Sequence, residues 1–224
     1  MSIVKQALAK CCRCGQEHEL QVHKSINAAQ EPDLKQKVRD GSLFLWKCPQ
    51  CGTVNLARYE CLYHDPDRRF MVWLLPVGSV SEAEMASISL HAKALGGYTL
   101  RKVTDVGALM EKVLALDEGL DDVALEICKY VTRQEMGGTE PSDTAGPDEA
   151  AGTGRIPAGA PLHFFRKEED RLVFSYPAEG QMQALAVGMN VYEDALGILQ
   201  RNPNLQPAEG FQQIDSVWLS TVLR

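Results

Sequence analysis

Two cysteine pairs with identical spacing constrain the fold of this chain more than any other feature of the sequence. Cys11 and Cys14 form the first pair, Cys48 and Cys51 form the second, and each pair reads Cys-x-x-Cys-Gly. A two-residue gap allows one tight turn to bring both sulfurs to the same metal ion, at about 2.3 Å. The glycine that follows each pair can adopt a positive φ without steric cost, so that backbone N–H groups can point at the thiolates.

Four cysteines in this pattern predict a closed structural Zn²⁺ site that leaves no coordination position for a catalytic water. The two pairs are separated by 33 residues. Closing a loop of that length costs roughly 3 kcal/mol plus a constant, whereas structural zinc supplies on the order of 10–16 kcal/mol near neutral pH. Iron is the rival metal, because a tetrahedral sulfur site also accepts it. We expect zinc.

The other cysteines and two nearby histidines are secondary candidates. Cys12 lies inside the first pair, and only one residue separates it from Cys14, which is too few for both sulfurs to bind one ion well. We therefore expect that Cys12 does not bind the metal. Cys61 and Cys128 are expected to be small buried hydrophobes. His18 and His23 are possible alternative ligands, but four cysteines already fill the coordination shell.

The cysteine count and the hydropathy pattern indicate a reducing compartment. Seven cysteines are present, six of them within the first 61 residues. An odd number in a chain without a recognisable secretory signal argues against a disulfide framework. The longest apolar run, residues 70–77, has eight residues, and a membrane helix needs about 20. We therefore expect a cytoplasmic protein with no membrane-spanning segment.

The net charge of −7 is unevenly distributed along the chain. Residues 1–73 hold 11 Lys and Arg against 8 Asp and Glu, which gives +3, and the remaining residues hold 12 against 22, which gives −10. Nucleic-acid affinity depends on neutralising phosphates with basic side chains. We therefore do not expect nucleic acid as a partner, although a small basic face on the first third is kept as an alternative.

Hydrophobic periodicity and turn residues predict an α+β protein. We expect an N-terminal zinc ribbon with short antiparallel strands, then a helical hairpin, then a C-terminal α+β unit. Strands are expected at residues 19–22, 43–47, 54–63, 69–75, 98–103, 162–167, 171–176 and 185–187. Helices are expected at residues 32–39, 81–96, 106–114, 123–131, 191–199 and 214–222, with Asp121 or Asp122 and Asp215 as caps.

Composition divides the chain into three parts. Residues 136–161 hold six Gly, four Pro and four Ser or Thr with no apolar period, which is typical of a flexible linker. The predicted domains are therefore residues 1–135 with the zinc ribbon, the linker, and residues 162–224. The last part is small for independent stability, so we expect it to pack on the first.

These motifs resemble the bacterial CpXC family, which is named for paired Cys-Pro-x-Cys motifs. Cys48-Pro-Gln-Cys51 matches outright, whereas the first pair departs because Cys12 occupies the proline position. Further similar segments are residues 25–28, 32–35, 62–66, 70–72 and 116–122, so that the resemblance covers roughly residues 8–133. The resemblance implies a zinc-ribbon-like N-terminal unit and no particular activity.

The sequence favours a non-catalytic zinc-binding module that acts as a protein-binding or scaffold unit. No nucleophile–base pair or phosphate-binding glycine loop is recognisable, and a proline-containing turn explains His64 with its two neighbouring aspartates. Trp46, just before the second pair, is expected to cover the metal site. One alternative is a thiol–disulfide or redox-sensing protein that uses Cys11/Cys14 or Cys48/Cys51. Another is a nucleic-acid-associated zinc ribbon that uses the basic residues Arg13, Lys24, Lys47 and Arg58.

Overall fold

The computed structural model describes residues 3–76, 96–137, 156–157 and 159–223, which form two compact units. The first unit holds Met1–Val113 and Pro207–Gln213, and the second holds Leu114–Gln206 and Ile214–Arg224. The predicted domain boundaries, and the packing of residues 162–224 on the first domain, stay predictions. Most of the predicted linker and nearly all of the predicted helix 81–96 lie outside the described residues.

A five-stranded mixed sheet forms the frame of the first unit, with strand order β1-β2-β5-β6-β7. Its pairs β1–β2 and β5–β6 are antiparallel, and its pairs β2–β5 and β6–β7 are parallel. The strands are β1 (Ile3–Lys10), β2 (Glu17–Asn27), β5 (Cys61–Asp65), β6 (Phe70–Leu74) and β7 (Thr99–Val103). Between β2 and β5 lie α1 (Pro32–Arg39), a 3₁₀ turn (Ser42–Phe44), and the two-stranded hairpin of β3 (Leu45–Lys47) and β4 (Val54–Leu56).

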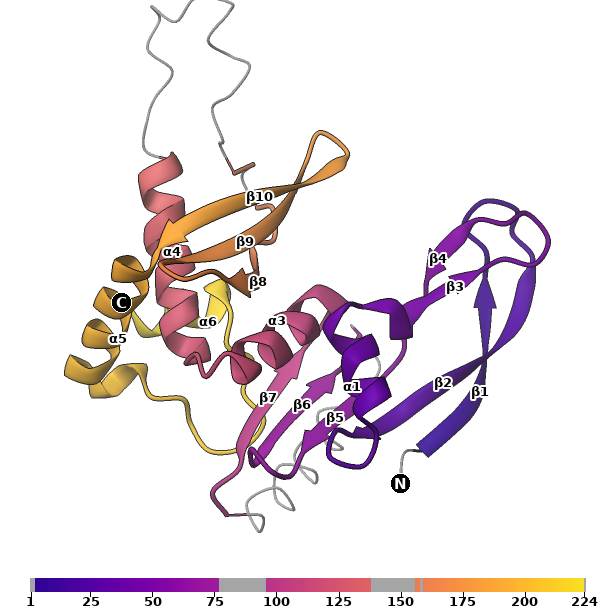
Figure 1. Cartoon of the computed structure of the whole chain (residues 1–224), viewed down its shortest axis with the longest axis horizontal. Coiled ribbons are helices and arrows are strands. Elements are labelled where there is room, and N and C mark those ends of the chain that lie inside the picture. The colour runs from indigo at the N-terminus through magenta and orange to yellow at the C-terminus, as the bar shows by residue number, and fades with distance from the viewer. Residues whose placement is uncertain (1–2, 77–95, 138–155, 158, 224) are drawn as a thin grey trace, which may run out of the picture. The chain divides into compact units, whose positions relative to one another are not determined.

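The two hairpins of this unit end in the two cysteine pairs. The β1–β2 hairpin closes between Lys10 and Glu17, and the β3–β4 hairpin closes between Lys47 and Val54. Figure 1 shows the tips of these hairpins side by side, although they are far apart in the sequence. The fold therefore brings both predicted metal-binding turns to one end of the first unit.

Residues from near the C-terminus complete the opposite edge of the sheet. Gln212 forms a parallel bridge with Arg101 of β7, through its backbone N–H to the carbonyl of Leu100 and its carbonyl to the N–H of Lys102. The neighbouring Phe211 packs edge-on against Trp73 of β6, with ring centroids 5.6 Å apart. These contacts cover the β7 edge, which would otherwise expose unpaired backbone groups.

The second unit is a three-stranded antiparallel sheet with helices. Its strands are β8 (His163–Lys167), β9 (Arg171–Ala178) and β10 (Gln181–Gly188), and its helices are the end of α3 (Val106–Asp117), α4 (Asp122–Gly137), α5 (Met189–Arg201) and α6 (Ser216–Val222), with a 3₁₀ turn at Pro203–Leu205. The carboxylate of Asp121 accepts from the N–H groups of Val123 and Ala124, and that of Asp215 accepts from Trp218. Both predicted caps are thus confirmed.

The chain is an α+β protein, as predicted from its periodicity. Several details differ from the expectation. The predicted strand 43–47 begins within a 3₁₀ turn, and the sheet of the first unit contains two parallel strand pairs where short antiparallel strands were expected. No sequence pattern indicated β1, because this edge strand has only exposed and half-buried residues and lacks an alternating apolar pattern. The extended segment predicted at 54–63 is two strands in different sheets, since β4 ends at Leu56 and β5 begins at Cys61.

Candidate metal centre

The two cysteine turns have the same backbone hydrogen bonds. In the first turn the N–H of Cys11 donates to the carbonyl of Gln16 at 2.9 Å, and the N–H of Gly15 donates to the carbonyl of Cys11 at 3.0 Å. In the second turn the corresponding bonds from Cys48 to Thr53 and from Gly52 to Cys48 are 2.8 and 2.9 Å long. The glycines have φ values of 73° and 72°, in the left-handed region that glycine adopts without strain.

The four predicted sulfurs lie together. The sulfurs of Cys11, Cys14, Cys48 and Cys51 are all within 4.8 Å of one another. Two of the separations run between the turns, at 3.6 Å for Cys11 with Cys51 and 3.6 Å for Cys14 with Cys48. A tetrahedral ion with four bonds of about 2.3 Å has sulfurs about 3.8 Å apart. The cluster is therefore compatible with metal binding.

Backbone and hydroxyl groups around the sulfurs favour ionisation of some thiols. The backbone N–H of Cys14 lowers the pKa of the Cys11 thiol to about 6. The hydroxyl of Thr53, whose oxygen lies 3.3 Å from the sulfur, lowers the pKa of Cys51. The N–H of Gln16 acts in the same direction on Cys14, but burial and the three neighbouring sulfurs outweigh it and raise that pKa to about 12. Four closely spaced thiols thus resist complete ionisation unless a cation is present.

Asn55 of β4 joins the two turns. Its Oδ1 accepts from the backbone N–H of Cys12 at 2.9 Å, and its Nδ2 donates to the carbonyl of Thr53 at 2.9 Å. The same Nδ2 lies 3.6 Å from the sulfur of Cys11, to which it also donates. Asn55 is buried, so its three contacts fix the distance between the hairpin tips. No motif in the sequence pointed to this residue.

His18 lies beside the cluster, next to one of its sulfurs. Its Nε2 is 3.4 Å from the sulfur of Cys48, a hydrogen-bonding distance. The imidazole packs edge-on against Trp46, with ring centroids 5.7 Å apart. This arrangement resembles the outer groups that orient and polarise metal ligands. Trp46 thus packs against His18, and His18 in turn lies beside the sulfur of Cys48.

The remaining candidates lie outside the cluster. Cys12 is exposed, and His23 lies on β2. Cys61 and Cys128 are fully buried, and burial raises the pKa of Cys61 to about 12 and of Cys128 to about 11. These two thiols are neutral buried side chains, as predicted.

His64 lies on strand β5, where it pairs with Met71 of β6, and does not belong to the cysteine cluster. Its Nε2 lies 3.2 Å from the hydroxyl of Tyr98, and burial lowers its pKa. The neighbouring Asp65 accepts from the N–H of Arg68 at 3.2 Å and pairs with Lys35 at 3.3 Å. The proline-containing turn lies at residues 66–69, two positions later than predicted, and His64 and Asp65 are the last two residues of the strand that precedes it.

In the part of the chain that the structure describes, no helix has the length and apolar character that a membrane crossing requires. No curated protein and no solved structure matches the chain. The family described as CpXC protein matches residues 9–129, a span that includes both cysteine turns, Asn55 and the five-stranded sheet except for most of β1. Because this match covers more than half of the 224 residues, the chain belongs to the CpXC family.

Proposed function

We propose that this chain is a non-catalytic module in which Cys11, Cys14, Cys48 and Cys51 bind one structural Zn²⁺. The metal ties the β1–β2 hairpin to the β3–β4 hairpin, and the assembled end of the first unit acts as a protein-binding or scaffold surface. The observation that carries this proposal is the placement of four sulfurs within 4.8 Å of one another by two turns of the same backbone geometry.

The surroundings of the sulfurs support a metal ion more than a disulfide. The cluster joins sulfurs of different turns at 3.6 Å, whereas redox chemistry of a Cys-x-x-Cys motif needs only the two cysteines of one turn. N–H and hydroxyl groups from Gln16, Thr53 and Asn55 offset thiolate charge, as they do at structural zinc sites. All seven thiols are unpaired in the structure, which supports the cytoplasm as the compartment.

Zinc fits the donor set for a chemical reason. Four thiolates are soft ligands in a tetrahedral arrangement, which Zn²⁺ accepts without any preference of its own for another geometry. When bound, the ion supplies the positive charge that allows all four cysteines to remain ionised. This chain's own contribution is to hold the sulfurs in place with Asn55 and the two hydrogen-bonded turns.

Metal analysis of the full-length protein tests this proposal. We expect about one equivalent of zinc per chain, and a loss of zinc when Cys14 or Cys51 is replaced by serine. Cys12→Ser is the matched control, because Cys12 lies in the same turn and outside the cluster; it should retain zinc. Equal zinc loss in the control and in Cys14→Ser, or redox cycling of the wild type without metal release, would contradict the proposal.

A further inference from the structure

A pocket lies on one face of the β1–β2 hairpin, next to the metal centre. Its volume is about 230 Å³, and it is lined by Ala7, Leu8, Ala9, Lys10, Leu20, Val22, Trp46, Leu56, Ala57, Arg58 and Tyr59. Ala7 pairs with Leu20 and Ala9 with His18 across the hairpin, so these side chains share one face of the sheet. The hollow exists because the two alanines are small.

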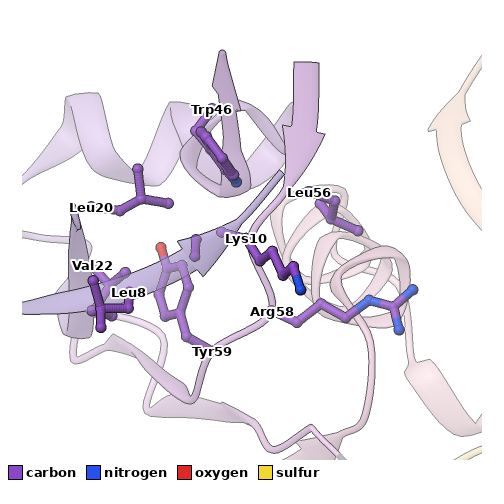
Figure 2. Close-up of a pocket in the computed structure, with 11 residues that line it drawn as sticks. Leu8, Lys10, Leu20, Val22, Trp46, Leu56, Arg58 and Tyr59 are labelled. Atoms are coloured by element: carbon purple, nitrogen blue, oxygen red, sulfur yellow. The ribbon is translucent and has the colours of Figure 1, made fainter. Parts of the chain in front are cut away.

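The pocket suits one large apolar side chain. Most of its lining is aliphatic or aromatic, with Trp46 and Tyr59 among the larger side chains in Figure 2. Small-molecule sites enclose about 300–1,000 Å³, and this pocket falls below that range. A leucine or phenylalanine side chain from another protein is therefore a better occupant than a nucleotide or a cofactor.

The neighbouring edge of the sheet is open to an added strand. At the other edge β7 is covered by Gln212, whereas among the described residues no segment pairs with the outer side of β1. Three apolar side chains of β1 are exposed, with Leu8 at 71% beside Ile3 and Val4, and the β3–β4 hairpin exposes three more, Leu45, Val54 and Leu56. A long edge strand with apolar side chains readily accepts an extended peptide.

The charge around the pocket selects an acidic peptide. Residues 1–22 and 41–59, which include both strands of the hairpin, carry five basic side chains, Lys5, Lys10, Arg13, Lys47 and Arg58, against the two acidic ones Glu17 and Glu19. Four thiolates with a divalent ion would contribute −2, which leaves +1 for these segments. The residues that line the pocket include two basic side chains, Lys10 and Arg58, and no acidic one. Lys10 and Arg58 form no ion pair with the described residues, and in Figure 2 both extend to the side of the pocket opposite Leu20 and Val22. Two unpaired cations beside an apolar hollow complement carboxylates next to an apolar residue.

We propose that an extended acidic segment of a partner protein pairs with the free edge of β1 and inserts one large apolar side chain into the pocket over Ala7 and Ala9. This inference rests on the proposed function, because the metal holds Trp46 and the β3–β4 hairpin beside β1. Side chains on one face of a strand recur at every second residue. An acidic residue of the partner two positions from the apolar residue would therefore lie on the same face, on the side of the pocket where Lys10 and Arg58 extend.

Peptide selection tests the proposal while the partner itself is still unidentified. Random twelve-residue peptides displayed on phage are selected on the full-length protein, whose zinc content is measured in the same sample. We expect enrichment of peptides with one large aliphatic or aromatic residue flanked by Asp or Glu. Enrichment of basic peptides, or the lack of any shared pattern on zinc-loaded protein, would overturn the docking inference and leave the metal centre intact. Protein without zinc would instead contradict the proposed function.

Three variants then locate the site with a fluorescein-labelled enriched peptide. Ala9→Leu fills the pocket and Arg58→Glu reverses its charge; each should weaken binding by about tenfold or more. Lys167→Glu in the second unit is the matched charge control and should bind as the wild type does. Zinc content and circular dichroism show whether each variant folds. If Ala9→Leu does not fold, Arg58→Glu still tests the site.

Other occupants of this face would give different results. Light scattering would detect a dimer that uses the β1 edge, and such a dimer would overturn the partner assigned here. Competition by a single-stranded oligonucleotide for the bound peptide, lost at high salt, would assign the basic face to nucleic acid instead. Unchanged binding to Ala9→Leu would also contradict the proposal, because the peptide would then lie elsewhere.

Discussion

The side-chain amide of Asn55 lies between the two cysteine turns and accepts the backbone N–H of Cys12 at 2.9 Å, across 43 positions of sequence. Its Nδ2 donates to the sulfur of Cys11 and to the carbonyl of Thr53. One residue of β4 therefore links the backbone of one turn to that of the other. This link exists in addition to any metal ion that the four sulfurs hold.

Asn55→Ala should destabilise the first unit. The substitution leaves the buried N–H of Cys12 without its acceptor and removes a donor from Cys11, which costs about 1–3 kcal/mol. Urea unfolding of the zinc-loaded protein measures this change, and chelator competition should show weaker zinc binding. Asn202→Ala, at the exposed end of α5, is the control. Equal effects of the two substitutions would show that Asn55 does not link the turns.

Cys12→Pro tests the same hydrogen bond by removing its donor, the backbone N–H of residue 12. Proline is acceptable to the backbone at the equivalent position, because Pro49 occupies it in a turn with the same hydrogen bonds. Proline lacks the N–H that Asn55 accepts, so we expect a loss of about 1 kcal/mol. Cys12→Ser keeps the N–H and should unfold at the same urea concentration as the wild type. A proline variant as stable as the serine variant would contradict this role for Asn55.

Gly15→Ala and Gly52→Ala should be equally destabilising, because the turns are equivalent. A Cβ at either position would meet its nearest neighbour, Lys10 or Lys47, at 3.8 or 3.7 Å, so there is space for it. The penalty is conformational, about 1–2 kcal/mol for a side chain at positive φ. Gly197→Ala inside α5 is the control and should stabilise by about 0.5–1 kcal/mol. Thermal unfolding compares the three, and a large difference between the two turn variants would contradict the equivalence.

Thiol reactivity should divide the seven cysteines into three classes. At pH 7.5 with zinc bound, Cys12 alone should react rapidly, because four cysteines hold metal and the other two are buried. A chelator should raise the number of rapidly reacting thiols from one to five, and a denaturant should raise it to seven. The measurement is a timed reaction with an aromatic disulfide reagent. Five rapidly reacting thiols before chelation would show that the cluster holds no metal.

Alkaline pH should destabilise the second unit through Cys128. Burial raises the pKa of this thiol from 9.0 to about 11, so the folded chain retains a proton that the unfolded chain loses. Its contribution to stability is therefore present below pH 9 and is lost as the pH rises toward 11. The penalty of Cys128→Ala, measured by urea unfolding, should be smaller at pH 10.5 than at pH 8. A penalty independent of pH would indicate that the thiol is not protected by burial.

The cysteine spacing and the helix caps could be predicted because they are local. The two-residue gap and the following glycine determine each turn within five residues, and the carboxylates of Asp121 and Asp215 bond to N–H groups two or three positions away. Asn55 and His18 could not be assigned in this way, since their contacts join residues 30 to 44 positions apart. Such pairing depends on how the hairpins meet.

The burial of Asn55 also runs against the pattern of its own strand. It lies between Val54 and Leu56, which are exposed, while the asparagine between them is buried. A polar residue flanked by apolar ones in a short strand after a metal-binding turn thus reverses the usual burial pattern. β1 could not be predicted for another reason, which is that none of its eight residues is buried.

X-ray absorption at the zinc edge of the purified full-length protein tests the central claim most directly. We predict a first shell of four sulfurs at about 2.3 Å and no nitrogen or oxygen ligand, with His18 hydrogen-bonded to Cys48 outside that shell. The same shell should persist in His18→Ala and in Cys12→Ser. A shell that contains imidazole nitrogen or fewer than four sulfurs, or a protein that holds no zinc, would contradict the account.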